Sequence, residues 1–182
     1  LFVLNHYGLI SDEFKNELNK TASLIDELQE EIQADAEKMT NHLFGKIPII
    51  YACDGYKGMA IRFTQQLAEN SKMLSWHNII PEMNHNELVG WRTKNENLAV
   101  IFFRNETDHK RNQKRIEINS EVVSKYTSSV MEYWSKGDSM IEKTFYLINV
   151  CDHVSFNLSK RNNVIVEEIE VINYLKGELA KF

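Results

Sequence analysis

Hydrophobic positions recur with helical spacing in the first quarter of the chain. Ser11, followed by Asp12 and Glu13, is a typical helix start. The apolar positions that follow are Phe14, Leu18, Leu24, Ile25, Leu28, Ile32 and Met39. This spacing predicts one or two amphipathic helices from residue 11 to about residue 43, and Gly45 ends the segment. We interpret the charged run DELQEEIQADAEK as a solvent-exposed face of these helices.

After Gly45 the pattern changes to short apolar runs that alternate with helical stretches. The runs are IPIIYAC (47 to 53), HNII (77 to 80), NLAVIFF (97 to 103), RIEIN (115 to 119) and SSVMEYW (128 to 134). Such alternation is typical of β-α repeats with a parallel sheet. The central runs lack the in-out alternation of a half-exposed strand, so we expect helices on both faces. Two helices should close the chain, one from Gly137-Asp138-Ser139 to about Lys160 and one from Val166 or Glu167 to near Lys181.

Composition narrows the classes of function. The 182 residues, 43% of them hydrophobic, suffice for a proper core in one or at most two domains. The formal charge of −5, with 21 basic and 26 acidic side chains spread along the chain, gives no basic stripe for nucleic acid. The longest apolar runs are far shorter than the roughly 20 residues that cross a bilayer. Cys53 and Cys151 are isolated, without the spacing of a zinc site or the cysteine density of a disulfide scaffold. We therefore expect the protein to be located in the cytoplasm.

Glu69 is the first candidate for chemistry. It lies in AENSK, in the last turn of the helix expected after the first strand, where the helix dipole favours cations. Such an unfavourable placement fits a residue that has another use. On local pattern alone, a solvated glutamate beside Lys72 is the favoured explanation.

His85 is the second candidate, in the stretch PEMNHNE behind Pro81. Asn84 could cap a short helix with Glu87 at its third position, as in a capping box. In that reading the asparagines are caps and His85 is exposed and idle. In the other reading, His85 brings a group that titrates near neutral pH to a substrate.

Five stretches of the chain resemble, in order and spacing, the carboxyl half of the bifunctional phosphoglucose/phosphomannose isomerases. They are AENSK, PEMNHNELVGW, NLAVIFFRNETDHKRNQKRIEIN, EKTFYLINVCDHVSFNLSKRNN and VINYLKGEL. The most specific elements are EN-x-K and PE-x-NHNE, which place Glu69 and His85 sixteen residues apart. The resemblance covers residues 45 to 182 and implies an SIS domain with a flavodoxin-like, five-stranded parallel sheet in three α/β/α layers. Residues 1 to 44 then resemble the helices that join this domain to an amino-terminal SIS domain.

The resemblance also implies roles for individual residues. Glu69 matches the family's catalytic base, which moves a proton between C1 and C2 of the open-chain sugar phosphate through a cis-enediol. His85 matches a histidine that helps to open the sugar ring and that is delivered across a dimer interface. Lys176 matches a lysine that serves the ring oxygen, although an ordinary cationic helix end would explain it too. The implied substrate is a hexose 6-phosphate, and the implied assembly is a homodimer. We expect Glu69 and the opposing active-site groups to converge at the carboxyl edge of the parallel sheet, where ligands gather in open α/β sheets.

The chemistry fits these residue types. A C–H proton next to a carbonyl is weakly acidic, so aldose-ketose exchange needs a carboxylate base held close to it, preferably in a dry pocket. Ring opening needs proton exchange near neutral pH, where histidine titrates. This reaction needs no metal or organic cofactor, and we expect none.

The chain departs from the family pattern at two helix entries. It has YACDGYKG where the family has a Gly-Ser-like turn after the first strand, and NNVIVEE where an Asp-Pro pair opens the last helix. The family's phosphate-binding loops belong to the amino half, so we expect the 182 residues alone to be inactive. Two other functions stay open: a sugar-phosphate-binding module without catalysis, such as a sensor or regulator, and a half that serves mainly to dimerise.

Overall fold

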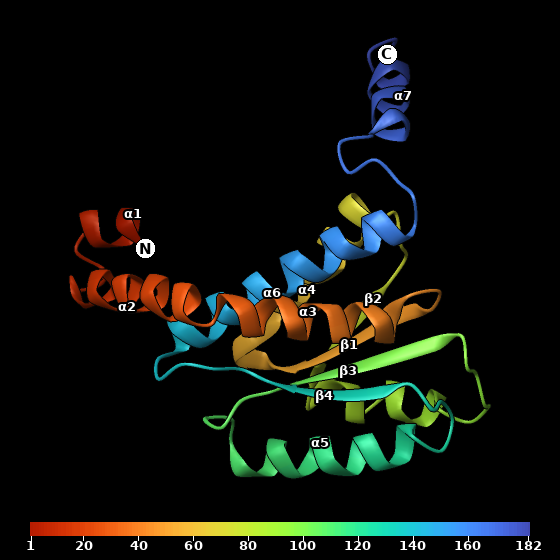
Figure 1. Ribbon diagram of the computed structural model, residues 1–182, viewed down its shortest axis with the longest axis horizontal. Helices are drawn as coiled ribbons and strands as arrows, with labels where there is room; N and C mark the ends of the chain where they lie inside the picture. Colours follow the sequence, from red (N-terminus) through yellow and green to blue (C-terminus); the bar gives the residue numbers. More distant parts are fainter.

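The computed structural model describes all residues, 1–182, and shows an α/β unit built around one parallel sheet (Figure 1). The strands are β1 (Ile47–Cys53), β2 (Trp76–Ile80), β3 (Leu98–Arg104) and β4 (Val130–Trp134). The helices are α1 (Phe2–His6), α2 (Glu13–Glu27), α3 (Gln29–Leu43), α4 (Lys57–Ser71), α5 (Lys110–Val123), α6 (Met140–Arg161) and α7 (Glu170–Leu179), with short 3-10 turns η1 (Asp54–Tyr56), η2 (Glu82–Asn84) and η3 (Glu87–Gly90).

The sheet order is β2-β1-β3-β4, and all three pairings are parallel. The expected parallel sheet with helices on both faces is therefore confirmed, but the expected number of five strands is wrong, because the sheet has four. Four of the five apolar runs form these strands.

The fifth run, RIEIN, lies inside α5 and is a helix. Its alternating letters resemble a strand only over five residues. In the longer window, Ile116, Asn119 and Val123 are the buried residues of α5, and this spacing of three and four is the helical one. Ile118, which a strand would place on the same face as Ile116, is 47% exposed.

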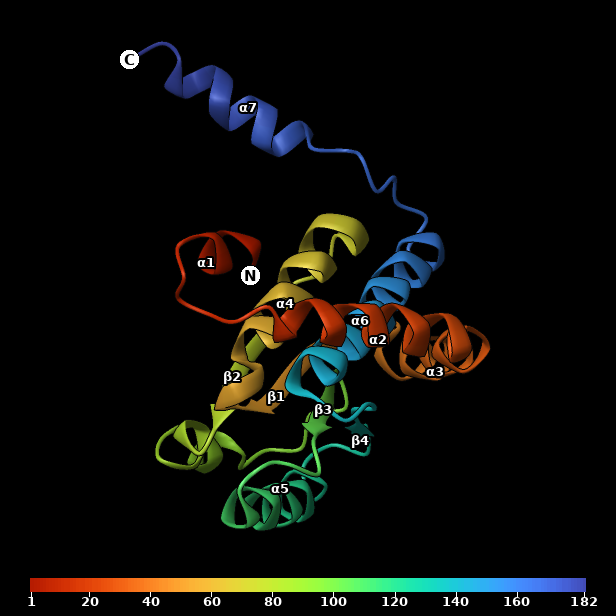
Figure 2. The same cartoon turned by 90° about the vertical axis from the view of Figure 1, so that its left-hand side faces the viewer.

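Each central strand contributes side chains to two separate cores. On one face, Ile50 and Ile101 join a cluster with side chains of α3, α4 and α6. On the other face, Tyr51 and Phe102 pack with Met83 of η2 and with Ile116 of α5. The sheet thus separates α4 from the η2–η3 region and α5, and this separation decides where the candidate residues lie (Figure 2).

The helix predicted for residues 11 to 43 forms as α2 and α3. Although we expected residues 1–44 to be linker helices, α3 places Ile32, Ala36, Met39 and Leu43 in the core, fully buried. In this chain, α3 is thus part of the α/β unit. Whether residues 1–44 also join a further domain stays a prediction.

The predicted start of the penultimate helix is confirmed in detail. Ser139 caps α6 in a capping box: its hydroxyl accepts from the Glu142 N–H, while the Glu142 carboxylate accepts from the backbone of Ser139. Gly137 makes the entry at φ +112°, where a Cβ would lie 2.5 Å from the Glu142 Cβ.

The two terminal helices differ from the rest because neither contains a buried residue. Helix α7 projects away from the sheet and from the other helices (Figures 1 and 2). Its exposed apolar side chains include Val171, Leu175 and Leu179. None of the chain's helices combines the length and the apolar character that crossing a bilayer requires.

The helical assignment of residues 115–119 predicts unequal effects of two isoleucine truncations. Ile116→Ala should lower the free energy of unfolding by about 2–5 kcal/mol, because it leaves a cavity in the core. The matched variant Ile118→Ala should change it by less than about 0.5 kcal/mol, because that side chain is 47% exposed and belongs to neither core. Urea unfolding of both variants measures this. Equal losses would indicate a shared face and would contradict the helix.

Candidate functional site

Glu69 lies in the last turn of α4, and its side chain is exposed. Helix α4 follows β1 and runs back along the sheet, so its last turn lies where the strands begin, near Trp76 at the start of β2. Its side chain lines a cavity of about 240 Å³ with Lys72, Glu168, Ile169 and Ile172, and others. Glu69 therefore faces the base of α7, at the amino-terminal end of the sheet.

His85 lies beyond the opposite end of β2, between η2 and η3, and its side chain is exposed without a hydrogen bond. The residues before it are held firmly. Met83 is fully buried on the α5 face of the sheet. The Asn84 amide donates to Oδ1 of the fully buried Asn119 of α5, 2.6 Å away. The imidazole is thus presented to solvent from a fixed backbone.

The expected cap in this stretch forms two residues later than the sequence suggested. Asn86, not Asn84, is the N-cap, and its side chain accepts a hydrogen bond from the Glu87 N–H over 2.6 Å. Asn84 is committed to Asn119 instead. Tertiary contact with α5 thus overrides the local capping pattern.

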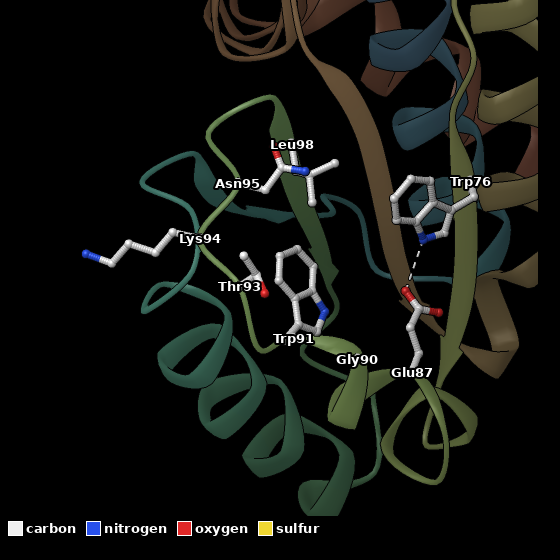
Figure 3. Close-up of a pocket in the computed structure, with 8 residues that line it drawn as sticks. All are labelled: Trp76, Glu87, Gly90, Trp91, Thr93, Lys94, Asn95 and Leu98. Atoms are coloured by element: carbon white, nitrogen blue, oxygen red, sulfur yellow. Dashed lines mark hydrogen bonds between the residues drawn. The ribbon is translucent and has the colours of Figure 1, made fainter.

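Glu87 has the most hydrogen bonds of the residues in PEMNHNE. One carboxylate oxygen accepts from Tyr51 Oη at 2.5 Å and Trp76 Nε1 at 3.0 Å, and the other accepts from Asn78 Nδ2 at 2.6 Å. Glu87 and Trp76 point toward each other beside a cavity of about 410 Å³, which Trp91 also lines (Figure 3). The carboxylate ties η3 to both β1 and β2.

Lys176 lies on the exposed surface of α7, and its side chain makes no hydrogen bond or ion pair. The base of its helix meets the cavity that Glu69 lines, through Val171 and Ile172. The structure therefore brings Glu69 to the helix that carries Lys176, while leaving the ammonium group in solvent.

The three candidates do not converge at the carboxyl edge of the sheet, which is where parallel α/β sheets gather ligands. Glu69 is at the amino edge, because a helix that follows a strand returns to that edge. Glu69 and His85 also lie on opposite faces, since α4 packs on one side of the sheet and Met83 on the other. Along the strand direction, the length of β2 alone separates Glu69 from His85 by roughly 16 Å, at about 3.3 Å a residue.

The carboxyl edge itself offers little to a phosphate. The turn after β1 exposes Asp54, whose charge repels an anion. Arg104, at the end of β3, is only 5% exposed, pairs with Glu132 and stacks on Trp134, with its guanidinium 4.5 Å from the ring centroid. Burial, with a contribution from Asp108, raises the pKa of Cys53 to about 12, which keeps the thiol protonated and unreactive at neutral pH.

Sequence reasoning missed two residues that organise this region. Lys72 donates to the carbonyl oxygens of Glu69, Val166 and Glu168 at 2.6, 3.1 and 2.8 Å, and so fixes the segment that leads into α7. Glu87 was considered only for capping. The two residues stand within AENSK and PEMNHNE, but the partners that tie them to other elements include residues 36 to 96 positions away, so no local signal identifies them.

Comparison with known proteins places this chain in a family. A family model described as bacterial phospho-glucose isomerase C-terminal SIS domain matches residues 32–179. A bifunctional phosphoglucose/phosphomannose isomerase of Caldicellulosiruptor bescii is 30% identical, over 96% of this chain and 54% of that protein. One from Aquifex aeolicus is 28% identical, over 98% of this chain and 55% of that protein. The chain thus spans about half the length of these relatives.

The fold has a counterpart among solved structures. The C-terminal domain of glucosamine-fructose-6-phosphate aminotransferase from Francisella tularensis superposes with a TM-score of 0.68 at 12% identity, covering 90% of this chain and 50% of that one. At this identity the likeness concerns the fold alone.

The contacts of Lys72 predict that it immobilises the segment before α7. Lys72→Met should speed amide hydrogen exchange in residues 166–172 about tenfold or more, because it removes charge-assisted bonds of the kind that contribute about 1.5–3 kcal/mol. Lys110→Met, which removes an exposed lysine of α5 without a side-chain partner, should leave this segment unchanged. Unchanged exchange in Lys72→Met would show that other contacts hold the segment.

Proposed function

Because the chain belongs to the bacterial phosphoglucose isomerase C-terminal SIS-domain family, we propose that it is one half of an aldose-ketose isomerase. The substrates are glucose 6-phosphate, mannose 6-phosphate and fructose 6-phosphate, in keeping with the bifunctional relatives. The observation that supports this most directly is the position of Glu69, which faces the cavity at the base of the helix that carries Lys176.

In the proposed reaction, the Glu69 carboxylate removes the proton from C2 of the open-chain aldose. The electron pair of that C–H bond forms the C1–C2 double bond while the C1 carbonyl oxygen takes up a proton, which gives a cis-enediol. The C2 hydroxyl then loses its proton as the C2 carbonyl forms, and the Glu69 carboxylic acid returns its proton to C1 to give the ketose. His85 and Lys176 serve the earlier step, in which a proton reaches the ring oxygen as the hemiacetal opens. Each step is a proton transfer, which carboxylate, imidazole and ammonium groups perform without a cofactor.

The separation of Glu69 from His85 bears on how a site is assembled. Both side chains are exposed, and the sheet lies between them, so neither can reach a sugar bound by the other within one copy. We propose that His85 of a second copy completes the site beside Glu69, in a homodimer. This arrangement also gives a reason for an imidazole that is held rigidly but faces outward.

The phosphate group needs converging backbone N–H groups or a cluster of cations. Asp54 at the first turn and the paired Arg104 provide neither. We propose that the phosphate is bound by a part of the enzyme other than these 182 residues, which alone would then bind hexose phosphate poorly and show no turnover. The same part would cover Glu69 and give the base the dry surroundings that proton abstraction favours.

The non-catalytic alternative, a sugar-phosphate sensor, would use the same fold without a base. Turnover distinguishes the two functions, because a sensor would bind its ligand without isomerising it, whereas an isomerase would lose turnover with glutamine at position 69. The fold by itself does not distinguish them.

Replacing the proposed base tests the function directly. In the natural full-length enzyme, Glu69→Gln should lower kcat for glucose 6-phosphate isomerisation by about 10²- to 10⁴-fold, because it keeps the shape and removes the base. Binding of 6-phosphogluconate, measured by titration calorimetry, should persist. Glu121→Gln, an exposed carboxylate on α5, serves as the control and should keep full turnover. Undiminished turnover in Glu69→Gln would assign proton transfer to another residue.

A further inference from the structure

Glu87 has a set of contacts that capping does not require. Three donors from two strands, Tyr51, Trp76 and Asn78, converge on its two oxygens. Trp91 extends the network, since its Nε1 donates to Tyr51 Oη at 3.3 Å. A surface glutamate whose only task was to begin a 3-10 turn would need none of these partners.

The donors require an acceptor with no hydrogen of its own. Burial and the neighbouring carboxylate raise the pKa of Tyr51 far above its usual value, so its hydroxyl stays protonated and donates. Exchanging the oxygen and nitrogen of the Asn78 amide would break a hydrogen bond, because its oxygen already accepts from the Ile79 N–H at 2.7 Å. A glutamine at position 87 would turn an N–H₂ group toward one of these donors.

His85 lies between two attachments of the same loop. On its amino side, Asn84 is bonded to Asn119 of α5. On its carboxyl side, two residues away, Glu87 is bonded to β1 and β2. The imidazole between them is exposed and has no partner of its own, so these attachments are what determines its location.

We infer that Glu87 is a positioning residue that fixes His85 in the orientation needed for ring opening, by bonding its loop to Tyr51, Trp76 and Asn78. The inference rests on the proposed function for the role of His85, but the attachment itself does not. Glu87 does not touch the substrate. It acts by holding the backbone from which the imidazole projects, and an error of about 1 Å in such a group can cost up to about 100-fold in rate.

The test combines substitutions of Glu87 with a measurement on His85. In the full-length enzyme, Glu87→Gln should lower kcat for isomerisation by about 10- to 100-fold while KM stays within about twofold, since the binding of the sugar phosphate is not affected. Trp76→Phe removes one of the three donors from a side chain that is 40% exposed, and should give a smaller loss in a folded protein. Glu82→Gln is the control, because this exposed carboxylate of the same loop accepts only from Asn86, at 3.3 Å.

A double-mutant cycle with His85→Ala identifies the route of the effect. If Glu87 acts through His85, Glu87→Gln should cause no further loss of kcat once His85 is absent. An equal loss in both backgrounds would overturn the inference, because Glu87 would then act independently of the histidine. Wild-type kcat in Glu87→Gln would overturn it as well.

Hydrogen exchange of residues 81–90 gives a readout that does not depend on activity. Glu87→Gln should speed exchange in this loop and leave α6 protected, whereas Glu82→Gln should leave both unchanged. If the wild-type enzyme shows no isomerisation of any hexose 6-phosphate, the proposed function fails, and faster exchange in Glu87→Gln would still establish the attachment. Unchanged exchange would refute the attachment whatever the activity.

Discussion

The parallel pairing of β1 with strands on both sides is the constraint on which the rest of the structure depends. β1 bonds to β2 along one edge and to β3 along the other, and six of its seven residues are buried. A parallel neighbour can be reached only by a crossover, so the chain must return along a face of the sheet after each strand. Helix α4 makes the return from β1 to β2 and α5 the return from β3 to β4, on opposite faces, and each helps to bury one of the two cores, while the segment with η2 and η3 connects β2 to β3.

This constraint also determines where the candidate catalytic residues lie. A helix that returns ends where the next strand begins, which places Glu69 at the amino end of the sheet. A loop that follows a strand lies at the other end, which places His85 there. Two residues only sixteen positions apart in sequence are therefore separated by the sheet and by the length of β2. A site that uses both requires a second copy of the chain, and the outward-facing imidazole is consistent with that requirement.

Much of the fold could be predicted from the sequence because it follows from local patterns. Continuous apolar runs such as IPIIYAC become strands buried on both faces, and the helix expected to open at Gly137-Asp138-Ser139 begins after Ser139. RIEIN was misassigned because five alternating letters fit either period, and only the wider spacing of Ile116, Asn119 and Val123 reveals the helix. The placement of Glu69 at the carboxyl edge was wrong because the return direction of α4 was not taken into account.

The parts that the sequence could not provide are contacts between distant residues. Tyr51 and Glu87 are 36 positions apart, and the carbonyls that Lys72 holds are up to 96 positions away. No local period encodes such pairs, because tertiary packing brings them together. The roles assigned to Glu69, His85 and Lys176 derive from resemblance to a family, and the structure adds where each one stands.

The central claim is that one copy of the chain cannot bring Glu69 and His85 to the same sugar. The most direct measurement is complementation between full-length Glu69→Gln and His85→Ala variants, each strongly impaired alone, after co-expression or subunit exchange. In a two-fold dimer, half of the randomly formed dimers contain one of each variant and restore one of two sites, so about a quarter of wild-type activity should return. Failure to regain activity, with mixed dimers shown to be present, would contradict a site shared between copies.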